Sequence, residues 1–280
     1  MALSVHFLNN AALIDIITQT QESMNNNEVN LMNDVIETIL NHRSIRQFED
    51  KPLTEEQIKT IVSCAQAAAT SSFIQAYSII GVKDPVKKKK LAELAGNQEY
   101  VEKNGHFLLF CADLYRHSII GEKEDKNVKE SLESTEKFMV SLIDAALAAQ
   151  NAAIAAESLG LGICYIGGIR NNLEEVKKVL NIPVRVIPLF GLAIGYPAKI
   201  TGQKPRLPFE HVYHEDGYEQ NKEIYLQQLD DYNEVIANYY QQRTDGVRKD
   251  RWTEQMAAML EKQNRMYMKE FIQKNKLDLR

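Results

Sequence analysis

The chain has 280 residues, of which 44% are hydrophobic and 25% are charged, proportions that are ordinary for a globular protein. Its formal net charge of -5 argues against a general affinity for nucleic acid, which needs a basic face. No stretch is judged long and apolar enough to span a membrane, and the N-terminus has no signal-peptide pattern. We therefore expect a cytoplasmic protein whose partners include neither nucleic acid nor a membrane.

Cysteine and histidine spacing argues against disulfide or metal chemistry. The three cysteines, Cys64, Cys111 and Cys164, form no CxxC pair and each lies among apolar or small residues. They are predicted to be reduced thiols that pack as small hydrophobic side chains. His211 and His214 lie three residues apart in a loop, and we interpret them as solvated, so no metal site is predicted.

Two helices and a strand are predicted in the first part of the chain. Residues 29–41 form the first helix, with apolar side chains on one face. Thr54-Glu55-Glu56-Gln57 is a capping box that begins a second helix. The buried stripe of this helix is predicted to be Ile58, Ile61, Val62, Ala65 and Ala69. A strand over residues 77–82 follows a polar segment, 70–72. Residues 1–28 show no such pattern and are expected to be a poorly ordered extension.

The central part is predicted to hold a helix over 86–94, a strand over 107–112 and an exposed charged segment over 123–136. A long helix over 138–159 carries two alanine-rich runs. Small apolar side chains on all its faces indicate that the helix is buried on every side. A single chain would bury only one face, so we expect a second subunit to cover the rest.

Strands over 164–166 and 186–194 flank a helix over 173–180, and residues 199–214 form a loop. Two C-terminal helices, 222–242 and 252–274, are joined by the charged turn 243–249. Helices and strands are interspersed without a regular βαβ rhythm, which favours the α+β class. With no internal repeat or linker, residues 29–280 are predicted to be one domain with a C-terminal helical arm.

A cationic segment follows the first helix. His42-Arg43-Ser44-Ile45-Arg46 places two arginines, a histidine and a hydroxyl within five residues. Arginine presents a planar fork of donors that matches phosphate, so the segment is typical of a site for a dianionic group. A solvated basic turn is the alternative reading of the segment taken alone.

Two further segments could approach a ligand. Gly167 and Gly168 end the 164–166 strand, and adjacent glycines allow main-chain N–H groups to approach a flat molecule, although a tight turn needs them too. Lys204 and Arg206 flank a rigid proline, with ordinary surface charge as the alternative. The glycine spacing is not a dinucleotide fingerprint, and the sequence has no P-loop, HExxH or G-x-S-x-G motif.

Taken in order, these segments resemble one family. The motifs are HRSIRQF, PLTEEQ, SSFIQ, GNQEY, FCAD, AAESLGLG, YIGG, KPRLP and YYxxR. In combination they are similar to the FMN-dependent nitroreductase superfamily, and more narrowly to its NADPH nitroreductase and flavin reductase branch, from about residue 29 to the C-terminus. The resemblance implies a central, mostly antiparallel sheet flanked by helices in an intertwined homodimer, with FMN between the subunits.

The resemblance also implies which residues hold FMN, tightly but without a covalent bond. The phosphate and ribityl chain would contact His42, Arg43 and Ser44. Flavin N1 and O2 would lie near Arg46. Loop residues from across the subunit boundary would be Ser71, Ser72 and Gln75. Ring-side contacts would be Gln98 and Tyr100. The stretch under the isoalloxazine near N5 would be Tyr165, Ile166, Gly167 and Gly168. Further cations at the phosphate end would be Lys204 and Arg206.

The activity implied is that of an oxidoreductase with NADPH as co-substrate. Hydride chemistry would occur on FMN, with two-electron, ping-pong transfer to nitroaromatics, quinones or free flavin and no catalytic acid or base on the protein. Arg243 matches the family's contact with the 2′-phosphate of NADPH, with Arg248 and Lys249 behind it; a solvated basic turn is the alternative. Two other functions stay open: a dedicated NADPH:FMN reductase, and a non-catalytic flavin carrier.

Overall fold

The computed structural model describes residues 31–280. The expected extension, 1–28, and the start of the first predicted helix lie outside the described residues. The described chain divides into two compact units, which are treated separately below. The larger comprises residues 32–202 and 265–280, and the smaller comprises residues 203–264 together with Leu31.

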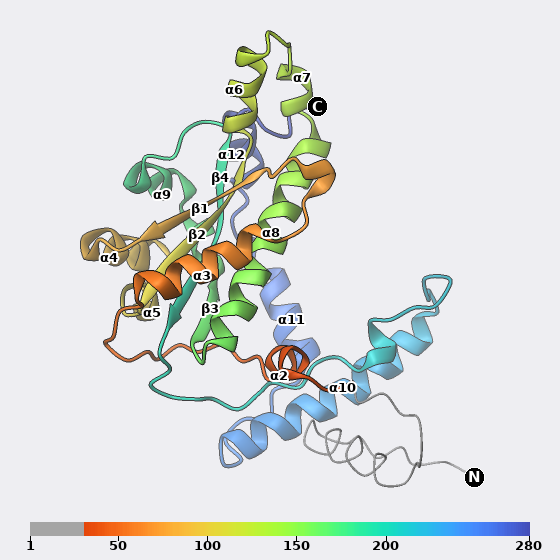
Figure 1. Cartoon of the computed structure of the whole chain (residues 1–280). Helices are drawn as coiled ribbons and strands as arrows, with labels where there is room; N and C mark the ends of the chain where they lie inside the picture. The colour runs from red at the N-terminus through yellow and green to blue at the C-terminus, as the bar shows by residue number, and fades with distance from the viewer. Residues whose placement is uncertain (1–30) are drawn as a thin grey trace. The chain divides into compact units, whose positions relative to one another are not determined.

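The larger unit is built on a four-stranded antiparallel sheet (Figure 1). Its strands are β1 (Tyr77–Val82), β2 (His106–Asp113), β4 (Val186–Gly195) and β3 (Gly162–Ile166), in that spatial order. Every residue of β2 is buried, because the strand is paired on both sides and covered on both faces. The predicted α+β class and antiparallel sheet are confirmed.

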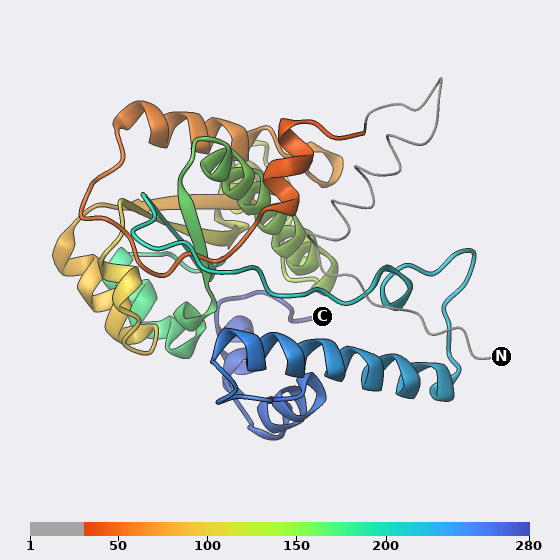
Figure 2. The ribbon, with the colours of Figure 1, turned by 90° about the horizontal axis from the view of Figure 1, so that it is seen from below.

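Helices surround this sheet, and two of them, α3 (Glu55–Gln66) and α8 (Thr135–Ser158), pack on each other beside it (Figure 2). The other helices of the larger unit are α2 (Asp34–Leu40), α4 (Pro85–Leu94), α5 (Glu99–Glu102), α6 (Tyr115–Lys123), α7 (Lys129–Leu132), α9 (Leu173–Leu180) and α12 (Met268–Lys274). Two short 3-10 helices, η1 (Ser71–Phe73) and η2 (Gly167–Asn171), follow α3 and β3.

Helix starts agree with local capping chemistry. The Thr54 hydroxyl accepts a hydrogen bond from the Gln57 amide at 3.1 Å, and the Gln57 side chain accepts one from the Thr54 amide at 3.0 Å. This predicted capping box is therefore confirmed, and α3 begins at Glu55. The first described helix begins later than predicted, at Asp34, because the side chain of Asn33 caps the free amides of Val35 and Ile36.

Helix α8 is the central helix of the larger unit. Its alanines from Ala145 to Ala156 are largely buried. By length and composition α8 could cross a membrane, so the sequence-based statement that no stretch is long and apolar enough was wrong. A core helix passes the same test, and more than half of its most apolar stretch is buried. One stripe of large apolar side chains stays exposed on α8, formed by Met139, Ile143 and Leu147.

Two predictions about elements were wrong, and one helix was missed. The expected helix over 252–274 is two helices, α11 (Trp252–Glu261) and α12, and between them Arg265 adopts a left-handed φ of 58° that no helix allows. The charged segment 123–136 is not wholly exposed, because Leu132 and Glu133 are buried. Glu133 pairs there with Arg185 at 3.3 Å and with Arg280 at 3.2 Å. Helix α6 was not predicted.

The smaller unit is helical, with α10 (Lys222–Arg243), α11 and the short η3 (Phe209–His211). Its core is formed by Tyr232, Ile236 and Tyr240 of α10, against which Trp252 packs. The Tyr232 hydroxyl donates to the Pro205 carbonyl at 2.9 Å and so fixes the loop before η3.

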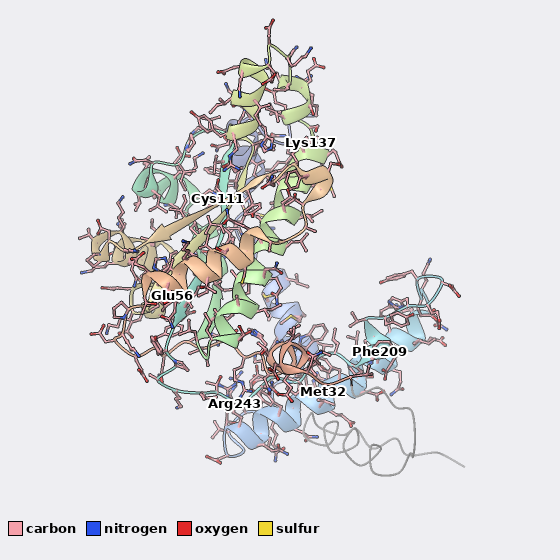
Figure 3. All side chains as sticks on the ribbon, viewed as in Figure 1. Met32, Glu56, Cys111, Lys137, Phe209 and Arg243 are labelled. Atoms are coloured by element: carbon pink, nitrogen blue, oxygen red, sulfur yellow. The ribbon has the colours of Figure 1, made fainter. Side chains whose placement is uncertain are left out.

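Cysteine packing agrees with the sequence. All three cysteines are free thiols; Cys111 lies within the sheet (Figure 3), Cys164 is buried on β3, and Cys64 is partly buried on α3. Burial raises the pKa of the Cys111 thiol far above its usual value, which makes it inert.

Candidate functional site

The His42–Arg46 segment runs alongside β3. Ser44 forms a parallel bridge with Ile163, and the Ile45 amide donates to the Ile163 carbonyl at 2.8 Å. Ile45 is buried beside Gly162, where a Cβ atom would lie 2.6 Å from the Ile45 side chain. Because side chains alternate in extended backbone, anchoring Ile45 turns its neighbours Ser44 and Arg46 the other way. Arg46 is accordingly exposed.

His42 is held by a carboxylate from far along the chain. Its Nδ1 lies 2.7 Å from Oε1 of Glu157, which is in the last turn of α8 and has a side chain only 14% exposed. The bond to Nδ1 leaves the Nε2 edge of the ring as the one available to a ligand. Sequence reasoning missed Glu157, although a carboxylate inside the alanine-rich motif AAESLGLG was a usable signal.

A second set of contacts joins Ser44, Arg46, Tyr100 and Cys164. Burial raises the pKa of the Tyr100 phenol, and a hydrogen bond with Arg46 opposes that rise. Burial likewise raises the pKa of Cys164, against the charge of Arg46 and a hydrogen bond with Ser44. The guanidinium of Arg46 therefore lies beside β3 and α5, so the predicted residues Arg46 and Tyr100 are brought together.

The Tyr165–Gly168 stretch comes directly after Cys164 and joins β3 to η2. Tyr165 packs edge-to-face on Phe190, with ring centroids 5.6 Å apart, and partial burial of its ring raises its pKa. Gly168 has a packing reason of its own, since a Cβ atom there would lie 2.3 Å from the Ala95 carbonyl oxygen. Gly168 thus seats η2 against the end of α4. At Gly167 a Cβ atom would meet only the end of the Arg170 side chain, at 3.2 Å, so Gly167 is the more open of the two.

Gln98 carries an unsatisfied acceptor. Its side-chain oxygen is buried and has no hydrogen-bond partner among residues 31–280. Gln98 lies directly before α5, the helix that carries Tyr100. The main-chain amide of Gln98 donates to the Ala92 carbonyl at 3.3 Å. Buried polar atoms are normally paired, so an orphaned oxygen beside the Arg46 cluster indicates a place where a donor from a ligand would bind.

The Ser71–Gln75 loop is held elsewhere on the larger unit. The carboxylate of Asp144, in the first half of α8, accepts hydrogen bonds from the Ser71 and Ala76 amides at 3.1 and 2.9 Å. Asp144 and Glu157 are thirteen residues apart on this helix, or about 20 Å along its axis. One chain therefore does not bring Ser71, Ser72 and Gln75 next to His42.

The smaller unit gathers cations around two neighbouring tyrosines, Tyr239 and Tyr240. Lys204 Nζ lies 5.6 Å from the ring centroid of Tyr240, and the Arg248 guanidinium carbon lies 4.2 Å from it. Burial raises the pKa of Tyr240, but the hydrogen bond and charge of Lys204, with the charge of Arg248, outweigh that effect and lower it. Lys204 and Arg248 thus share one ring.

Arg243 lies at the C-terminal end of α10 (Figure 3) and donates to the Tyr239 hydroxyl at 2.6 Å. The rings of Tyr239 and Tyr240 meet edge-to-face, with centroids 5.3 Å apart, so the two predicted NADPH-binding arginines lie on neighbouring rings. Arg248 is partly engaged by Asp250, at 2.7 Å. Arg206 is exposed, and its charge acts on Tyr232.

Comparison with known proteins adds independent findings. The sequence model of the nitroreductase family matches residues 39–196, and that of the nitroreductase family C-terminal domain matches residues 204–280. A relative from Bacillus subtilis (strain 168), named FMN reductase (NADPH), is 57% identical over 241 residues, which cover 86% of this chain and 97% of that relative. A relative from Staphylococcus haemolyticus, named NADPH-dependent oxidoreductase, is 43% identical over 87% of this chain and 97% of its own length.

Solved structures of similar sequence have the same fold as this chain. The structure of B. megaterium NfrA1 is 65% identical, with a TM-score of 0.87, and the match covers 88% of this chain and all of that one. NADPH:FMN oxidoreductase from Vibrio harveyi, solved with NAD+, is 37% identical, with a TM-score of 0.80 over 89% of this chain and all of that one.

Proposed function

This chain belongs to the nitroreductase family, and we propose that it is an FMN-dependent oxidoreductase that takes electrons from NADPH. The single observation that carries the proposal is the cluster of Ser44, Arg46, Tyr100 and Cys164 beside β3, with the unsatisfied side-chain oxygen of Gln98 two residues before Tyr100 in the chain. Bound FMN would supply two-electron redox chemistry between a reduced nicotinamide and an acceptor.

The residues present fit FMN chemically. A phosphate needs donors and positive charge, which His42, Arg43 and Ser44 offer, and charge-assisted hydrogen bonds contribute about 1.5–3 kcal/mol each. The buried oxygen of Gln98 can accept from a flavin ring N–H group. Arg46 can oppose negative charge near N1 and O2, while Tyr100 orients its guanidinium.

The remaining family positions are proposed as contacts on the same grounds. Tyr165, Ile166 and Gly167 end β3 and present main chain beside that cluster. Gly168 contributes by seating η2 on α4. Lys204 and Arg206 stay predicted contacts of the phosphate end, and their exposure supports that role. Family models match residues 39–196 and 204–280, and we propose that residues 29–280 act as a single FMN-binding domain with the C-terminal helices as its arm.

We further propose a homodimer. The exposed stripe of Met139, Ile143 and Leu147 on α8 is apolar surface that a second copy would cover. In a dimer, the Ser71–Gln75 loop would reach the partner's flavin, which accounts for its separation from His42 within one chain. Three free thiols support a cytoplasmic, reducing location.

NADPH preference is proposed to depend on Arg243, with Arg248 in support. Both guanidinium groups are exposed and held on tyrosine rings, an arrangement that can present them to a 2′-phosphate. NADH lacks this phosphate, so it would gain nothing from either arginine.

A dedicated flavin reductase is the second candidate, and the name of the Bacillus subtilis relative favours it. Steady-state kcat/KM with NADPH should be measured for free FMN, a quinone and a nitroaromatic. Turnover with all three supports the broader oxidoreductase, while turnover with free FMN only supports the dedicated reductase. If the protein binds flavin but NADPH does not reduce it, the protein would be a non-catalytic flavin carrier, and the proposed activity would be contradicted.

A further inference from the structure

The loop between α3 and β1 has a backbone that its sequence does not favour. Ser72, Phe73 and Gln75 all have left-handed φ angles, of 49°, 58° and 52°. None of them is glycine, and each such residue costs on the order of 1 kcal/mol or more, so surrounding contacts must impose the conformation. The Phe73 side chain is 82% exposed, so burial of that ring within this chain does not impose it.

Asp144 supplies the constraint. Its side chain is fully buried, and its two carboxylate oxygens each accept one main-chain amide, from Ser71 at the start of the loop and from Ala76 at its end. A buried carboxylate is costly unless its oxygens are satisfied, and here main-chain amides satisfy both. Because one carboxylate holds both amides, the two ends of the loop stay close together. His117 Nε2 also contacts the Ile74 carbonyl, within the loop, at 2.8 Å.

The neighbouring residue on α8 faces outward. Ile143 is 52% exposed and belongs to the apolar stripe with Met139 and Leu147. A single turn of α8 therefore carries the proposed dimer surface on one side and the loop anchor on the other. Ser71, Ser72 and Gln75, the loop's proposed flavin contacts, are all exposed.

We propose that Asp144 is a positioning residue for FMN: it holds the Ser71–Gln75 loop of one subunit in the shape that completes the partner's flavin site. The inference rests on the proposed FMN function. Asp144 does not touch the flavin, and it acts through the loop that it closes.

The first test is the FMN affinity of Asp144→Asn, measured by quenching of flavin fluorescence on apoprotein. Asparagine keeps the side chain's shape but presents an NH2 group to one of the two amides, so one hydrogen bond becomes a donor–donor contact. FMN affinity is expected to fall by about tenfold or more, with dimerisation retained in sedimentation. Glu133→Gln is the matched control: it also neutralises a buried carboxylate, just before the start of α8, and it should leave FMN affinity unchanged. Wild-type affinity in Asp144→Asn would overturn the inference.

The second test separates positioning in trans from a general loss of structure. Subunits carrying Asp144→Asn are mixed with subunits carrying Arg43→Ala, and mixed dimers are isolated through different tags. One of their two sites combines an intact Arg43 with an intact partner loop, so one FMN per dimer should bind with wild-type affinity. Absence of such a site would overturn the inference. Wild-type affinity in the Arg43→Ala homodimer would instead count against the proposed phosphate contact, and the Asp144→Asn titration would still decide the inference.

If Asp144→Asn does not fold, hydrogen exchange on the wild-type dimer provides the test. The Ser71 and Ala76 amides should exchange slowly and together, since one carboxylate holds both. Exchange as fast as that of an exposed loop would overturn the inference.

Discussion

His42 Nδ1 and Glu157 Oε1 lie 2.7 Å apart although 115 residues separate them in the chain. The contact joins the cationic segment to the last turn of α8, and Glu157 is mostly shielded from water. A histidine held in this way presents a fixed edge to its ligand and loses little freedom when the ligand binds.

Glu157→Gln should weaken FMN binding more than riboflavin binding. The amide still fills the space but can turn an NH2 group toward His42 Nδ1, so the ring would lose the fixed orientation that presents Nε2 to the phosphate. We expect a several-fold rise in the Kd of FMN, corresponding to about 1 kcal/mol, measured by fluorescence titration. Glu175→Gln, which breaks only a surface pair with Lys178, is the control. Equal losses for FMN and riboflavin would contradict a role at the phosphate.

Arg46→Ala should slow reduction of the bound flavin by NADPH while leaving stability nearly unchanged. Arg46 is exposed and contributes a charge rather than core packing. A loss of about 1.5–3 kcal/mol in a charge-assisted contact corresponds to roughly 10- to 150-fold in rate. Stopped-flow bleaching measures the rate, and thermal unfolding measures stability. Lys51→Ala is the matched control, because it removes another cation of the same segment, one whose Nζ lies 3.8 Å from the Tyr196 ring centroid. Unchanged reduction in Arg46→Ala would exclude its role near N1.

Arg243→Ala should raise KM for NADPH and leave KM for NADH nearly unchanged. The change removes a cation that only the 2′-phosphate would use, and an exposed contact of this kind should alter KM about tenfold. Arg251→Ala, which removes another exposed arginine of the smaller unit paired with Glu254, should affect neither cofactor. Parallel rises in both KM values would remove the 2′-phosphate assignment.

Acid stability should depend on His106. Burial first, with the charges of Lys83 and Lys88, lowers its pKa from 6.5 to about 4. Between these two values the unfolded chain binds more protons than the folded one, so the free energy of unfolding should fall as pH drops from about 6.5 to about 4. The loss is on the order of 3 kcal/mol. Urea unfolding across this range should give a flatter profile for His106→Gln than for wild type, with His211→Gln unchanged from wild type. Parallel profiles for His106→Gln and wild type would contradict the assignment.

Local features of the fold were readable from the sequence. The Thr54 capping box, the β1 strand and the α4 helix followed from side-chain chemistry and periodicity within a few residues. The break between α11 and α12 was missed because the left-handed Arg265 carries no glycine or proline signal. Burial of Glu133 was missed because its partners Arg185 and Arg280 are distant in sequence.

The site was predictable only where one segment carried the signal. His42, Arg43, Ser44 and Arg46 stand together in the sequence, and the structure places them beside β3. Glu157 and Asp144 were not predicted, because each acts on a segment more than sixty residues away. Gly168 was assigned to ligand approach, whereas its contact with Ala95 provides a packing reason that the sequence could not reveal.

The most direct test of the central claim is the visible spectrum of the purified, full-length protein, followed by identification of the chromophore released on denaturation. We expect a yellow protein with oxidised-flavin absorbance that NADPH bleaches, and FMN as the released compound at about one per chain. A colourless protein that takes up no added FMN would contradict it.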